Sequence, residues 1–167
     1  MVTLALVKEH CRIDDTASDT ILQQYLDAAT GIVEGRTGLA LSARSVVQEY
    51  TEFGDYIDPP LKPVNAVTTV EYLDTVGASQ TFTTFRVVDD KIYPNYGLYW
   101  PNVGNPAGIT LTYTTTANDI DELNSAILLL VGHYYENREA VVVGTITATL
   151  PMAVDALLDK YINRWIA

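Results

Sequence analysis

Hydrophobic residues follow a helical period at both ends of the chain, on either side of a long stretch with a different pattern. Near the start, Thr16 and Asp19 predict the N-terminus of a helix whose apolar positions keep this period to Val33. Gly38 favours its end, because glycine adopts the left-handed conformation common after helices. We therefore expect helical structure across residues 3–37, with a short amphipathic helix preceding the longer one.

Between about residues 44 and 114 the pattern changes to short runs rich in Val, Thr, Tyr and Phe, with partial alternation. The runs are SVVQEYTEF, AVTTVEYL, QTFTTFRVV and ITLTYTTT. The segment Asp74–Ser79 contains Gly77 and predicts a hairpin loop between the second run and the third. We expect these runs to form an antiparallel β block inserted between helical segments.

The run NDIDELNSAILLLVGHYYENREAV, which follows the β block, predicts the helix around which the chain is organised. Asp119 and Glu122 favour a start at residue 119, and we expect the helix to extend to residue 139. Ala126–Val131 are apolar at every position, and a helix that is apolar all round must be covered all round. Other helices of the chain or neighbouring copies of it could provide this cover, and we favour neighbouring copies.

The same helix ends in a polar and aromatic segment, Tyr134–Glu139. Tyrosine and arginine side chains are enriched at the energetic centres of protein interfaces. The alternative is that the tyrosines complete the core of their own chain while the charges face water. We predict a subunit interface formed by Ile127, Leu130, Tyr134, Tyr135, Asn137, Arg138, Val141 and Val143.

Residues 141–150, VVVGTITATL, have the composition of a strand but no hairpin partner in the sequence. We expect an extended arm that pairs with a sheet edge, either of its own chain or of a neighbouring copy. Pro151 then suits the first turn of a last helix over residues 151–165. The predicted fold class is α+β: a bundle of about four helices with an inserted antiparallel β block and this arm, in a single domain over residues 1–167.

The chain is acidic, with a formal net charge of −11 from 10 basic and 21 acidic residues. This balance disfavours binding of nucleic acid through its phosphates, which requires basic patches. The single cysteine, Cys11, excludes an internal disulfide framework. No window approaches the ~20 apolar residues of a transmembrane helix, so we expect no membrane partner.

Catalytic motifs are missing from the sequence. His10 and His133 are the two histidines, and neither belongs to a zinc-binding or nucleophile–base pattern. No glycine-rich phosphate loop or nucleophile elbow is present. We therefore expect no enzyme, no catalytic residue, no cofactor and no metal; an enzyme of unrecognised type would have to depend on a residue such as His133.

A loop in the β block, residues 94–108, carries Tyr96, Tyr99 and Trp100 among Gly, Asn and Pro. These aromatic side chains either cap their own sheet or serve as anchors for a partner. A second functional hypothesis follows from them, namely an α+β binding module that holds a carbohydrate or a peptide on this loop.

Four stretches together resemble the phage head-tail connector proteins, the gp6-like neck adaptors of long-tailed phages. They are LVKEHCRIDDTASDTILQQYLDAATGIVEGRTGLAL, LKPVNAVTTVEYLD, ILLLVGHYYENREAV and LPMAVDALLDKYI. Shorter proteins of this family lack much of the β block, so this chain is similar to the longer variant.

The resemblance implies a structural virion protein of the phage neck, located between the capsid vertex and the tail and in the host cytoplasm during assembly. Such proteins form a homo-oligomeric ring, commonly a dodecamer, which binds the portal protein and presents a platform for a stopper or tail-completion protein. The genome passes through the ring during packaging and ejection without specific binding. The resemblance places ring contacts on residues 119–139. It also places the C-terminal region near the portal, which points to Leu157, Tyr161, Arg164 and Trp165. As possible anchors for a partner, the loop residues Tyr96, Tyr99 and Trp100 join these as predicted portal or tail contacts.

Overall fold

The computed structural model describes residues 1–104, 108–137 and 152–162. The chain divides into two compact units, where the sequence predicts one domain over residues 1–167. The first unit combines Met1–Leu41 with Asn118–Ala167, and the second is Ser42–Ala117. The second unit spans the predicted β insertion. The described residues form four helices and antiparallel sheets, which confirms the α+β fold class.

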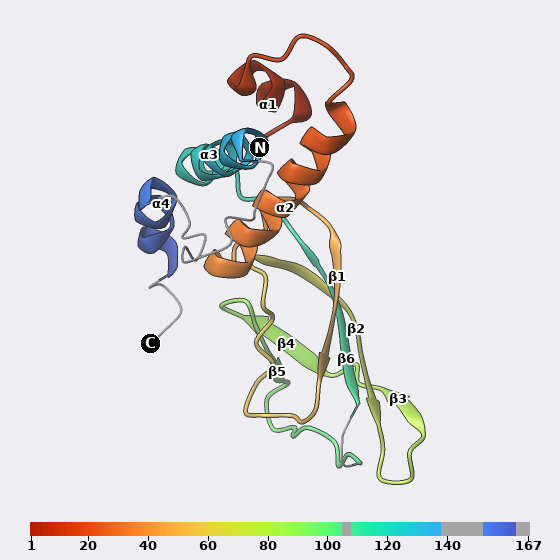
Figure 1. Ribbon diagram of the computed structural model, residues 1–167. Helices are drawn as coiled ribbons and strands as arrows, with labels where there is room; N and C mark the ends of the chain where they lie inside the picture. The colour runs from red at the N-terminus through yellow and green to blue at the C-terminus, as the bar shows by residue number, and fades with distance from the viewer. Residues whose placement is uncertain (105–107, 138–151, 163–167) are drawn as a thin grey trace, which may run out of the picture. The chain divides into compact units, whose positions relative to one another are not determined.

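The described helices all belong to the first unit (Figure 1). They are α1 (Leu4–Cys11), α2 (Asp19–Thr37), α3 (Asp121–Glu136) and α4 (Met152–Ile162). Helix α2 packs against each of the other three, and α3 packs against α1 and α4 as well. The predicted extended arm, residues 141–150, lies outside the described residues.

Capping interactions explain the start of α1 and the end of α2. The Thr3 hydroxyl accepts a hydrogen bond from the Leu6 N–H at 3.3 Å and so caps α1. Gly38, with φ of 67°, ends α2 and donates its N–H to the Glu34 carbonyl. The predicted start of α3 at Asp119 is wrong by two residues. Asp119 instead accepts hydrogen bonds from the N-terminal ammonium and from Asn124, so its carboxylate does not cap the helix.

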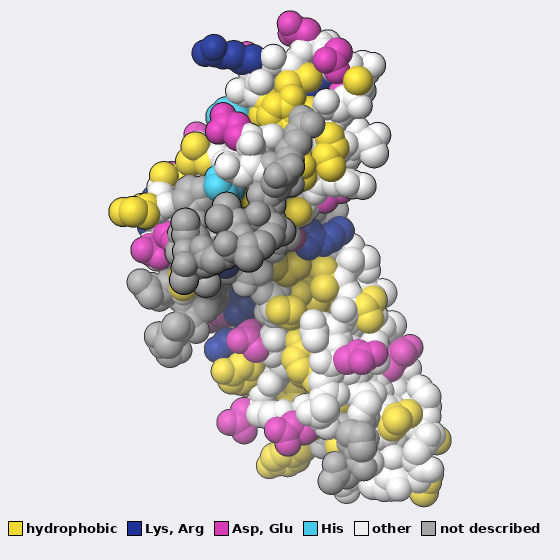
Figure 2. Space-filling model, in the orientation of Figure 1, with side chains coloured by type: hydrophobic (Ala, Val, Ile, Leu, Met, Phe, Trp, Pro, Cys, Tyr) yellow, Lys and Arg dark blue, Asp and Glu magenta, His cyan; other side chains and the backbone are white. Residues whose placement is uncertain are grey.

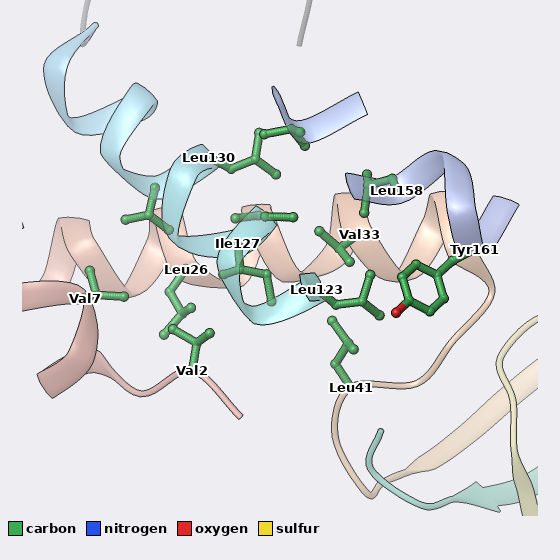
Figure 3. Close-up of a cluster of buried hydrophobic side chains, with 14 of the residues drawn as sticks. Val2, Val7, Leu26, Val33, Leu41, Leu123, Ile127, Leu130, Leu158 and Tyr161 are labelled. Atoms are coloured by element: carbon green, nitrogen blue, oxygen red, sulfur yellow. The ribbon is translucent and has the colours of Figure 1, made fainter. Parts of the chain in front are cut away.

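One cluster of apolar side chains forms the core of the first unit (Figure 3). Leu123 and Ile127 of α3 meet Leu26 and Val33 of α2 within it, and Leu158 of α4 joins the same cluster. Each of these side chains is at most 7% exposed. Since burial of a leucine or isoleucine contributes about 1.5–3 kcal/mol, this cluster supplies the hydrophobic stabilisation of the helical unit.

The second unit contains two antiparallel sheets (Figure 1). The larger sheet has the strand order β1-β6-β2-β3, and the smaller one pairs β4 with β5. The strands are β1 (Ser45–Tyr50), β2 (Val64–Leu73), β3 (Ser79–Thr81), β4 (Phe85–Val88), β5 (Lys91–Pro94) and β6 (Ile109–Thr115). The central strand β6 buries Ile109, Leu111 and Tyr113 on one face, while threonines alternate with them on the other.

The β2–β3 hairpin confirms the predicted loop. Leu73 pairs with Ser79 across it, and Gly77 has a φ of 82° that suits glycine. The Asp74 carboxylate accepts hydrogen bonds from the backbone N–H groups of Val76 and Ala78, at 3.0 and 2.9 Å. These donors favour the charged form, so they lower the pKa of Asp74.

The run QTFTTFRVV does not form the single strand that its composition predicts. Pairing of β3 with β2 ends at Thr81, and the chain then starts a separate hairpin of β4 and β5. Asp89 and Asp90 form the two-residue turn of that hairpin, with φ of 50° and 61°. Positive φ at both turn positions matches the twist of paired strands, and aspartate tolerates it better than most residues.

Candidate functional site

The apolar segment of α3 is covered largely by its own chain. Ile127 is 2% exposed and Leu130 is 1% exposed, and both belong to the core of the first unit. This burial corrects the prediction that they form a subunit interface, because neither side chain has surface left to present to another copy. Leu129, which the sequence analysis did not single out, is 39% exposed on the same helix.

The tyrosines at the end of α3 are half-buried and take part in their own core. The ring of Tyr134 lies 5.9 Å from that of Tyr25 on α2, at an interplanar angle of 51°. Burial raises the pKa of Tyr134. Tyr135 also packs against the core cluster with part of its surface exposed. These contacts agree with the alternative that both tyrosines complete the core, and they leave part of each ring available to a partner.

Asn137 ends the helix rather than projecting freely. Its backbone N–H donates to the His133 carbonyl at 3.0 Å, and its side-chain amide donates to the same oxygen at 2.9 Å. The amide nitrogen also lies 3.2 Å from Nδ1 of His133. The backbone bond continues the i→i−4 pattern of the helix, and the side-chain amide adds a second donor to the same carbonyl. The half-buried His133 and the exposed Asn137 are therefore linked at the end of α3.

A hollow of about 320 Å³ lies between the ends of α1 and α3. It is lined by His10, Cys11, Arg12, Gly132, Tyr135 and Glu136. Burial and the nearby Glu136 carboxylate both raise the pKa of Cys11. A raised pKa keeps the thiol protonated, and the protonated form is a poor nucleophile. Within the described residues, no group of three or more His, Cys, Asp or Glu side chains is arranged to hold a metal ion.

Of the two residues of α4 that were predicted to contact the portal or the tail, one is buried in the core and the other is partly exposed. Tyr161 is 6% exposed and belongs to the core of the first unit, which corrects its assignment as a portal or tail contact. Leu157 packs against that core and stays partly exposed. The remaining predicted residues, Arg138, Val141, Val143, Arg164 and Trp165, lie outside the described residues.

The three aromatic side chains of the loop after β5 have different environments. Trp100 stacks on Phe53 with ring centroids 4.5 Å apart and an interplanar angle of 3°, and it packs against the core of the second unit. Tyr96 and Tyr99 are 86% and 88% exposed. Trp100 thus caps its own sheet, which is the first of the two alternatives given for these side chains. Tyr96 and Tyr99 remain available as anchors for a partner, which is the second.

Arg86 of β4, which the sequence analysis did not identify, lies close to the rings of Tyr93 on β5 and of Tyr96 in the loop. Its guanidinium carbon is 4.2 Å from the centroid of Tyr96 and 5.1 Å from that of Tyr93. Its Nε donates a hydrogen bond to the Pro94 carbonyl at 3.3 Å. Cation–π attraction of this kind contributes about 0.5–1 kcal/mol at exposed sites. Arg86 therefore contacts the exposed Tyr96 ring and favours its observed position.

Acidic side chains are spread over the face shown in Figure 2 and do not gather into one patch. The chain carries 21 acidic and 10 basic residues, so a duplex near most of its surface would meet repulsion. None of the described helices is both long and apolar enough to cross a bilayer.

Residues 1–74 match the family model of the phage gp6-like head-tail connector protein. This match contains the first two of the four stretches quoted above, whereas the stretches at residues 127–141 and 150–162 lie beyond it. No curated protein matches the chain.

Solved structures similar to this chain come from gene transfer agent (GTA) particles. One is a chain of the virion of a native GTA particle, with 26% sequence identity and a TM-score of 0.75. The similarity covers 96% of this chain and 88% of that one. A chain from the neck of an empty GTA particle, computed with C6 symmetry, has 25% identity, a TM-score of 0.73 and the same coverage. A third, from the neck of a native particle computed with C12 symmetry, has 26% identity and a TM-score of 0.70, over 95% and 86% of the two chains.

Proposed function

We propose that this chain, a structural head-tail connector that resembles the gp6-like family, forms a ring in the virion neck and joins the portal to the stopper or tail. The observation that carries this proposal is the similarity over 96% of the chain to a virion protein of a GTA particle. The family match over residues 1–74 supports the same role independently. The carbohydrate- or peptide-binding module has no support from these comparisons.

A ring is supported by the symmetry of the similar neck structures, which were computed with sixfold and twelvefold symmetry. A closed ring of identical copies uses a head-to-tail contact, in which two different patches of each copy meet. Twelve copies, the portal protein and a stopper or tail-completion protein are the specific partners that we propose. The family and the similar structures are virion neck proteins, which supports a role without catalysis.

In this ring, subunit contacts would use the parts of α3 that its own chain leaves uncovered. Leu129 and the exposed portions of Tyr134 and Tyr135 are the described candidates. Arg138, Val141 and Val143 extend this proposed interface beyond the described residues. Tyr96 and Tyr99 are proposed as contacts to the portal or the tail. A net charge of −11 suits a ring through which DNA passes without being bound.

Particle mass and shape test this function directly. The purified chain would be analysed by native mass spectrometry and electron microscopy, alone and after mixing with its portal protein. We expect annular particles, at least in the presence of the portal. A chain that stays monomeric and never joins a portal-sized particle would contradict the proposal. Monomers without the portal would not, because a ring can require its template to assemble.

A further inference from the structure

The second unit contains a cavity of about 340 Å³ beside the exposed aromatic loop, here called the aromatic cavity. It is lined by Gly54, Asp55, Arg86, Tyr93 and residues 94–100. Arg86 is the single Lys or Arg side chain in this lining. The guanidinium group of Arg86 contacts two rings and the Pro94 carbonyl, so less side-chain entropy is lost when a ligand binds to it.

Most hydrogen-bond donors of Arg86 have no partner among the described residues. A guanidinium has five N–H groups, and in the described part of the chain one of them, at Nε, donates to the Pro94 carbonyl. Its two terminal nitrogens make no hydrogen bond or ion pair with any described residue. Asp55 lines the same cavity and forms no ion pair with Arg86 among the described residues. Arg86 therefore keeps the pair of donors that matches the two oxygens of a carboxylate.

The surroundings of Arg86 favour a polypeptide ligand over a nucleic acid. Tyr96 and Tyr99 lie beside the cavity with 86% and 88% of their surface exposed, and both offer apolar contact area. One cation is enough to pair with one carboxylate, whereas a phosphate backbone is bound by several basic side chains together. Asp55 in the lining and the overall charge of −11 would repel a polyanion.

We propose that the aromatic cavity is a docking site for a polypeptide segment of a neighbouring neck protein that carries one carboxylate beside apolar side chains. A carboxylate of that segment pairs with the terminal nitrogens of Arg86, and an adjacent apolar side chain packs on Tyr96 and Tyr99. This inference rests on the proposed connector function, because a neck protein is what brings such a segment to the loop. It adds the chemistry of the partner and the residue that recognises it.

Peptide titration of the full-length, ¹⁵N-labelled chain tests the proposal. The probe is the blocked tripeptide acetyl-Leu-Glu-Leu-amide, and its control is acetyl-Leu-Gln-Leu-amide, which has the same shape without the charge. We expect the Glu peptide to shift the Arg86 Nε–H signal saturably, and the Gln peptide to bind roughly tenfold more weakly, since charged hydrogen bonds are about twice as strong as neutral ones. Equal binding of the two peptides would overturn the proposal.

Two variants separate recognition from folding. Arg86→Gln should abolish the preference for the Glu peptide while the amide signals of the first unit stay unchanged. Lys91→Gln is the matched control, because Lys91 lies on the same hairpin, 4.2 Å from the Tyr56 ring, but outside the cavity lining. This variant should bind as the parent does. Tyr96→Ala, which removes an exposed ring, should weaken the binding of both peptides. The inference would be overturned if Arg86→Gln kept its preference for the Glu peptide, or if the parent chain bound oligothymidylate more tightly than the Glu peptide.

Electron microscopy of the chain mixed with its portal distinguishes this inference from the connector function. Rings on the portal without any binding of the Glu peptide would overturn the docking site alone. Binding of the Glu peptide to Arg86 without any ring or portal-sized particle would support the site and contradict the connector function.

Discussion

Replacing Leu130 by alanine distinguishes a core residue from an interface residue on α3. Leu130 is 1% exposed and packs in the core of the helical unit. The substitution removes three carbon atoms, worth about 0.8 kcal/mol each, or roughly 2.4 kcal/mol of transfer free energy. The cavity left behind adds to this cost, because the surrounding core relaxes only partly. We expect the free energy of unfolding to fall by about 3 kcal/mol, within the ~2–5 kcal/mol range of buried leucines.

Leu129→Ala is the matched control, since Leu129 occupies the next position on the same helix and is 39% exposed. Solvent fills the space that this change leaves, and less apolar surface is lost, so we expect a decrease of about 1 kcal/mol. If Leu129 belongs to the ring contact, this variant should also weaken assembly on the portal. Leu130→Ala, by contrast, should lower the stability of the isolated monomer, whether or not a ring can form.

Urea denaturation of the monomer, followed by circular dichroism at 222 nm, provides the measurement. The described helices all belong to the first unit, so this signal reports the unfolding of the unit that contains Leu130. Thermal unfolding should show a lower Tm for Leu130→Ala by roughly 6–12 °C, at about 2–4 °C per kcal/mol for a chain of this size. Two variants that agree within about 0.5 kcal/mol would refute the assignment of Leu130 to the core.

Three further predictions concern other parts of the chain. Gly31→Ala and Gly35→Ala should each stabilise the monomer by up to about 1 kcal/mol in urea denaturation, because both glycines lie inside α2 with no atom within 4 Å of an added Cβ. Because its pKa is lowered in the folded state, the Asp74 carboxylate stabilises the hairpin at any pH above the pKa that it has in the unfolded chain. Protection of the loop amides from hydrogen exchange should decline as the pH falls through the lowered pKa. Asp74→Asn should remove this pH dependence. Arg138→Glu, outside the described residues, should leave a folded subunit by circular dichroism and reduce ring formation in electron microscopy; rings of normal yield would place the contact elsewhere.

Secondary structure followed from the sequence wherever the hydrophobic period was long. Helix α2 runs from Asp19 to Thr37, close to the range its apolar period predicts, because a helical stripe of this length has no competing interpretation. Short runs were less informative. Residues 80–88 have the composition of one strand but belong to two sheets, since the turn at Asp89 and Asp90 creates a second hairpin.

The sequence by itself determined that the segment from Ala126 to Val131 needs cover, because six successive apolar residues leave a helix no polar face. Only the tertiary structure decided where this cover comes from. Helices α1, α2 and α4 pack against α3, on which Leu130 is buried and Leu129 is partly exposed, although the two are neighbours of the same type. The contacts of Arg86 were likewise decided by the tertiary structure. Its guanidinium lies near the rings of Tyr93 and Tyr96 because a hairpin and a loop meet there only after folding. Periodicity describes one element at a time, whereas burial and pairing depend on what the other elements bring to it.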